Sequence, residues 1–110
     1  MKNLNSLKVA KILDEYRIVL NAGSEDNVTV GMSFVIFNYG DEIVDPDDGS
    51  HLGKLEITKG RVKVEYIQEK FCTAKSDIVT THRHATTGRT FTRTKELEDV
   101  KVGDHAKRVA

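Results

Sequence analysis

Short runs in which apolar and polar residues alternate recur along this chain, and several of them are separated by glycine. No segment repeats apolar residues three and four apart over three turns, as an amphipathic helix requires. Alternation with a period of two is typical of strands that have one buried face. The runs cover about residues 6–13, 16–23, 32–40, 51–76 and 104–110.

These strands predict an antiparallel sheet that closes on itself. An open sheet of this size would expose one face and two edges, whereas closure removes both edges. We therefore predict an all-β protein, a small antiparallel β-barrel of about six strands. The segment 104–110 is expected to pair back with the first strand, and Lys59–Gly60 is expected to break the fourth run. The residues that alternate with polar ones and are expected to share the inward faces are Leu7, Val9, Ile12 (imperfectly), Ile18, Leu20, Phe34, Ile36, Leu55, Ile57, Val62, Val64 and Tyr66 (or Ile67).

Length and composition are those of one soluble domain. The chain has 110 residues, of which 38% are apolar and 31% charged, so we predict a single domain spanning residues 1–110. No stretch approaches the roughly 18 apolar residues of a membrane helix, and the start lacks the pattern of a secretory signal. A single cysteine, Cys72, excludes an internal disulfide. We expect a cytoplasmic protein with no membrane contact.

Residues 41–48 carry five carboxylates, which raises the question of a cation site. Compared with a helix-loop-helix calcium loop that starts at Asp45, the sequence lacks the ligand at loop position 5, has its glycine one place early and has no helix on either side. A turn explains the same residues more simply. Pro46 fixes φ, Asp45 accepts hydrogen bonds from the backbone ahead of it, and Gly49 adopts a positive φ. We predict a turn without a metal, after which Leu52 re-enters the core.

Two short segments share the pattern Val-x-Val-Gly, namely NVTVGM at 27–32 and DVKVGD at 99–104. In each, the first valine is expected to enter the core, while the glycine takes a left-handed conformation that a Cβ would oppose. The repeated pattern also allows a two-fold pseudo-repeat within the barrel. The residues predicted to form structural turns are Gly23, Gly31, Asp45, Pro46, Gly49, Gly53 and Gly103.

The net charge is zero, but the charges are unevenly distributed along the chain. Residues 18–53 contain seven acids and no lysine or arginine, whereas residues 54–95 contain ten bases and four acids. One interpretation is a mixed, solvated surface in which adjacent strands interleave the charges. The other is a molecule with acidic and basic faces that pair head to tail or meet a charged partner.

Residues 78–95 are predicted to form a protruding basic hairpin with its tip near residues 86–88. The residues expected to contact a partner are Arg83, Arg89, Phe91, Arg93 and Lys95. On a strand, two arginines and the phenylalanine between them would share a face, a combination that can follow phosphates and stack on a base. An arm that pairs with another subunit explains the same residues more economically.

His82 and His84 are two apart, which on a strand places both on one side, as some metal sites require. A third ligand would have to come from His105, His51 or Cys72, none of which is near in sequence. An exposed polar hairpin is the preferred interpretation, so no metal and no cofactor is predicted. Cys72 is expected to be a small buried apolar residue rather than a nucleophile.

Residues 8–73 resemble the C-terminal domain of the flagellar assembly protein T family. The resemblance lies in a strand followed by N-x-G, a V-x-x-G turn and a D-P-x-x-G-x-x-L-G loop. The matching residues are Asn21, Gly23, Val28, Gly31, Asp45, Pro46, Gly49, Leu52 and Gly53. The resemblance implies a small β-barrel of the kind attached to other modules in bacterial envelope proteins or found alone in the cytoplasm. It implies no catalytic activity.

Three hypotheses for function follow. The leading one is a non-catalytic bacterial module for protein–protein interaction or assembly, whose partner is another protein or a copy of itself. The alternative is a small barrel that binds single-stranded nucleic acid through the basic arm at residues 80–95. The third is a metal- or ligand-binding domain that uses the histidines or the acidic loop.

Overall fold

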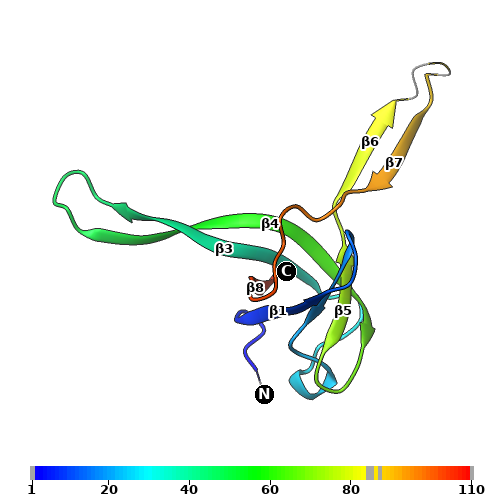
Figure 1. The fold of residues 1–110 in the computed structure, drawn as a ribbon, viewed down its shortest axis with the longest axis horizontal. Helices are drawn as coiled ribbons and strands as arrows, with labels where there is room; N and C mark the ends of the chain where they lie inside the picture. The colour runs from blue at the N-terminus through cyan, green and yellow to red at the C-terminus, as the bar shows by residue number, and fades with distance from the viewer. Residues whose placement is uncertain (1, 84–85, 87, 110) are drawn as a thin grey trace.

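The computed structural model describes residues 2–83, 86 and 88–109, and only the backbone of 79–83 and 91. In this part of the chain, six antiparallel strands close into a barrel in the order β1-β2-β5-β4-β3-β8, as the sequence predicts (Figure 1). The strands are β1 (Leu7–Ile12), β2 (Arg17–Leu20), β3 (Ser33–Val44), β4 (His51–Ile67), β5 (Cys72–Ser76) and β8 (His105–Val109). A short 3-10 helix, η1 (Ser24–Asp26), follows β2.

The last strand closes the ring. β8 pairs with β1, where Leu7 is opposite Ala106, and with β3, where Phe34 is opposite Arg108. The core is built by the alternation read from the sequence, since every second residue of β2 and of β5 is buried. The buried members of the predicted set are Leu7, Val9, Ile18, Leu20, Phe34, Ile36, Val62 and Val64, and Cys72, Ala74 and Ala106 join them. The prediction was wrong for Ile12, Leu55, Ile57 and Tyr66, which are 39%, 53%, 48% and 61% exposed, because alternation gives a shared face without showing what covers it.

The Val-x-Val-Gly segments both end in a turn ahead of a strand. Gly31 precedes β3 and Gly103 precedes β8, and each has φ +94. The amide of Gly31 donates to Val64 O at 3.0 Å, and that of Gly103 donates to Val9 O at 2.9 Å. A side chain would oppose this backbone conformation, which is why glycine stands at both positions.

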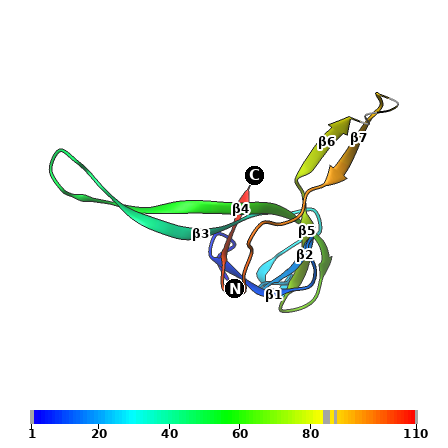
Figure 2. The same cartoon turned by 45° about the horizontal axis from the view of Figure 1, so that its top comes forward.

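β3 and β4 continue well past the end of the barrel. Residues 38–57, here called the β3–β4 arm, form a long twisted hairpin that projects from it (Figures 1 and 2). The sequence interpretation was wrong at Lys59–Gly60 and at Leu52. Lys59–Gly60 does not end a strand but produces an irregularity within β4, and Leu52 is 62% exposed instead of entering the core. The turn lies beyond the barrel, so the residues that follow it have no core to enter.

A second hairpin projects from another side of the barrel. β6 (Val79–Arg83) and β7 (Thr90–Thr94) pair from Val79↔Thr94 to Arg83↔Thr90 as a separate two-stranded sheet. This is the hairpin predicted at residues 78–95. The described chain therefore carries two projecting hairpins, of which the sequence identified one.

Candidate functional site

A buried carboxylate connects the base of the β3–β4 arm to the barrel. Asp104 is 2% exposed and accepts hydrogen bonds from Asn38 Nδ2 at 2.7 Å, Lys59 Nζ at 2.9 Å and Lys101 N at 2.8 Å. Burial by itself would raise the pKa of Asp104, but these donors outweigh it and hold the pKa below its ordinary value. Because Asn38 and Lys59 lie on β3 and β4, one side chain fixes both strands where they leave the barrel.

An aromatic cluster braces the arm on its outer side. The rings of Phe37 and His105 stack with centroids 5.5 Å apart, and Tyr39 meets both edge-on. Lys107 Nζ lies 4.9 Å from the Phe37 ring centroid and 2.6 Å from Glu56 Oε2. Strand β8 therefore contacts the first part of the arm through both aromatic and ionic groups.

The two faces of the arm differ in character. Ile43 lies opposite Gly53, and Leu55 and Ile57 follow Gly53 at spacings of two, so these aliphatic side chains share one face. The other face carries Glu42, Lys54 and Glu56, which alternate with them. The strand period thus gives the arm an aliphatic face and a charged face.

The aliphatic face continues the core-facing side of the barrel. Asn38 follows the buried Ile36 by two positions and lies opposite Ile57, so the inward side of β3 and β4 becomes the aliphatic face of the arm. Nothing in the described chain covers it, since Leu55 is 53% and Ile57 48% exposed. Half of the twelve exposed large apolar side chains among the described residues lie on this arm, namely Tyr39, Ile43, Val44, Leu52, Leu55 and Ile57.

The tip of the arm is a well-ordered acidic turn. Asp45 Oδ1 accepts from Asp47 N at 2.9 Å, Asp45 O accepts from Gly49 N at 2.8 Å, and Gly49 has φ +75. The backbone hydrogen bond from Ser50 lowers the pKa of Asp48, so its carboxylate is charged at neutral pH. Among the described residues, no three His, Cys, Asp or Glu side chains gather as metal ligands would. Gly53 lies within β4 rather than in the turn.

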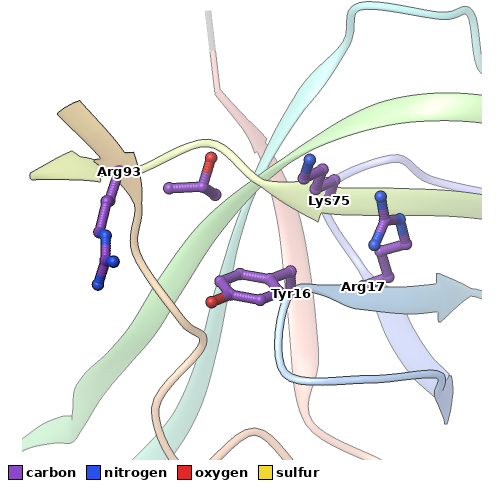
Figure 3. A pocket seen from close by; sticks show the side chains of 5 residues that line it. Tyr16, Arg17, Lys75 and Arg93 are labelled. Carbon is purple, nitrogen blue, oxygen red and sulfur yellow. The ribbon is translucent and has the colours of Figure 1, made fainter. Parts of the chain in front are cut away.

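A cationic pocket of about 520 Å³ lies between the barrel and the β6–β7 hairpin. Figure 3 shows Tyr16 between Arg93 on one side and Arg17 and Lys75 on the other. Lys75 lies directly opposite both Arg17 and Lys63 on its neighbouring strands, so three cations form a row across the sheet. Arg17 already binds Glu65 at 2.9 Å and Asp14 at 3.3 Å, which reduces the net charge of the row.

The predicted contact residues of the basic hairpin are only partly described. Arg93 lines the cationic pocket, Arg89 is exposed just before β7, and Lys95 forms an ion pair with Glu98 at 3.1 Å. The side chains of Arg83 and Phe91 lie outside the described residues. The structure therefore gathers one of the five predicted residues, Arg93, with Arg17 and Lys75, two cations that the sequence did not single out.

The predicted histidine pair lies outside the described residues, which contain neither the side chain of His82 nor any part of His84. His105 takes part in the aromatic cluster, and His51 Nδ1 lies 2.8 Å from Glu42 Oε1 on the arm. Burial raises the pKa of Cys72 to about 11, so its reactive thiolate is scarce at neutral pH.

No protein-family model matches the chain, and no curated protein matches it either. The relation to the flagellar assembly protein T family stays a prediction that depends on the motifs within residues 8–73. In the described part of the chain, no helix is long and apolar enough to cross a membrane.

Proposed function

We propose that this protein is a non-catalytic interaction module that presents the β3–β4 arm to a protein partner. The observation that carries the proposal is the aliphatic face of Ile43, Leu55 and Ile57, which continues the inward side of the barrel and is left uncovered by the residues that the structure describes. Soluble monomers rarely leave a contiguous apolar patch in water unless another surface binds it. The non-catalytic part of the proposal is supported by the family resemblance, which implies no catalytic activity.

The structure of the arm also favours binding on energetic grounds. Complete burial of a leucine or isoleucine gives about 1.5–3 kcal/mol, and side chains that are half exposed still have about half of this to gain. Two sets of contacts hold the arm in place before a partner arrives. Asp104 binds Asn38 and Lys59, and Lys107 binds Glu56. Because less freedom is lost on binding, more of the gain appears as affinity.

Site-specific photo-crosslinking in the native cells tests this proposal. A photoreactive residue at Leu55 or Ile57 is expected to give the same protein adduct, identified by mass spectrometry. The matched control is Val102, which is 64% exposed on the loop before β8, and it should give no such adduct. Equal adducts from the arm and from Val102, or none from the arm, would contradict the proposal.

A second candidate function is binding of single-stranded nucleic acid. It is favoured by the cationic row of Arg17, Lys75 and Lys63 beside a pocket that also holds Tyr16 and Arg93. Phosphates would relieve the repulsion between like charges on adjacent strands, and binding would weaken steeply with salt. A fluorescent oligothymidine at about 50 mM salt provides the test. Binding that Lys75→Glu abolishes and Leu55→Arg leaves intact would replace the first proposal by this one.

A further inference from the structure

A second surface feature is complementary to the β3–β4 arm, because it combines apolar residues with basic ones. A groove of about 570 Å³ lies on the outside of β1, β2 and the β4–β5 turn. Its lining includes four apolar residues, Ala10, Leu13, Val19 and Phe71. It also includes two lysines, Lys11 and Lys70. We call it the β1–β2 groove. Its remaining lining is polar and uncharged, so no carboxylate offsets the two lysines.

The shape of the groove follows from local structure. The register of β1 and β2 shifts between Val9 and Lys11, which makes Ala10 a bulge whose small side chain leaves room. Leu13 and Phe71 are both partly exposed, at the end of β1 and just before β5. Neither Lys11 nor Lys70 forms an ion pair within the part of the chain that the structure describes.

We propose that the β1–β2 groove receives the β3–β4 arm of a second copy of this chain. The inference deepens the proposed function and depends on it, because it names the partner of the arm. The aliphatic face of the arm would lie on Leu13, Val19 and Phe71, and the acidic tip would lie beside the two lysines. The tip supplies this charge through Asp45, Asp47 and Asp48, and the turn between β3 and β4 contains no lysine or arginine.

The arm of one molecule does not reach its own groove. It contains the first part of β4, whereas the groove includes the turn that follows the last residue of β4, at the opposite end of that strand (Figures 1 and 2). The contact therefore joins unlike surfaces of two copies, an arm on one and a groove on the next. Such head-to-tail contacts produce rings when the rotation closes and open chains when it does not.

A mixing experiment with two full-length variants tests this arrangement. Leu55→Arg disables the arm and leaves the groove intact, whereas Ala10→Arg fills the groove and leaves the arm intact. Both positions are exposed, so both variants should fold, which circular dichroism verifies. Val102→Arg is the matched control, an exposed aliphatic residue outside both surfaces. Solution mass is measured by light scattering and sedimentation, for each protein alone and for the mixture of the two variants.

The wild type and Val102→Arg are expected to self-associate, with affinity falling up to about tenfold between about 50 and about 500 mM salt. Each of the other variants should be monomeric by itself. Their equimolar mixture should give a one-to-one dimer and nothing larger, because only one intact arm and one intact groove remain. A mixture that stays monomeric, or a variant that still associates alone, overturns the proposal.

A monomeric wild type at about 1 mM would also overturn it. The proposed function would survive that result if crosslinking at Leu55 captured a different protein. If crosslinking at Leu55 captured no protein at all, both the proposed function and the self-association would be wrong.

Discussion

Replacing Asp104 by asparagine changes one atom of the junction that holds the base of the arm. One carboxylate oxygen accepts from Lys59 Nζ and from Lys101 N, and the other accepts from Asn38 Nδ2. An amide offers one oxygen, so its NH₂ group must face at least one of these donors. The ammonium group of Lys59, whose side chain is only 13% exposed, also loses its counter-charge.

The cost follows from the burial of the pair. Removing one partner of a buried ion pair typically destabilises by about 3–5 kcal/mol, and the residual exposure of Lys59 argues for the lower end. We expect Asp104→Asn to reduce the free energy of unfolding by about 3 kcal/mol. At about 2.1 cal/mol/K of unfolding entropy per residue, this lowers the Tm of a 110-residue chain by about 13 °C.

Urea unfolding of four proteins measures this effect and its cause. Asp47→Asn at the exposed tip is the control and should leave the midpoint unchanged. The double variant Asp104→Asn/Lys59→Met should be more stable than Asp104→Asn by about 1 kcal/mol, because it no longer contains the ammonium group of Lys59, which lacks its counter-charge in Asp104→Asn. A loss below about 0.5 kcal/mol in Asp104→Asn, or no recovery in the double variant, would refute the reasoning.

Three further predictions concern other groups. The pKa of Asp104 lies below its ordinary value of 3.8, so its contribution to stability is complete above that value and is lost as pH falls through the lowered pKa. The stability gap between wild type and Asp104→Asn should therefore shrink as pH falls below about 4 in urea titrations, and a constant gap would contradict this. Gly23→Ala should cost at least about 2 kcal/mol, since its Cβ would overlap Gln68 O, a backbone atom. Gly49→Ala, with open space at φ +75, should cost about 1 kcal/mol, and the reverse order would count against steric exclusion at Gly23. Cys72 should resist a thiol reagent at pH 8 in the native protein and react fully in denaturant, because burial raises its pKa to about 11. Rapid labelling of the native protein would show that the thiol is accessible.

Much of the barrel follows from local sequence. Alternation in the segments around Leu7, Ile18, Phe34 and Val62 determines which side chains share a face, since a strand turns every second side chain to the same side whatever its partners are. Glycine marks the turns before β3 and β8 because few other residues tolerate φ +94. These signals have a range of a few residues, so they can be read without the fold.

The arm could not be recognised in this way. Leu55 and Ile57 alternate with charged residues just as core residues do, and alternation shows that they share a face without showing what covers it. Coverage depends on where the barrel ends, which is set by pairing among six strands distant in sequence. The same long-range pairing places Arg17, Lys75 and Lys63 in one row and brings Asp104 to Asn38 and Lys59. Sequence by itself determined the strands and which side chains share a face, whereas the tertiary structure decided which of these faces are covered and which stay exposed, because coverage depends on pairing between strands distant in sequence.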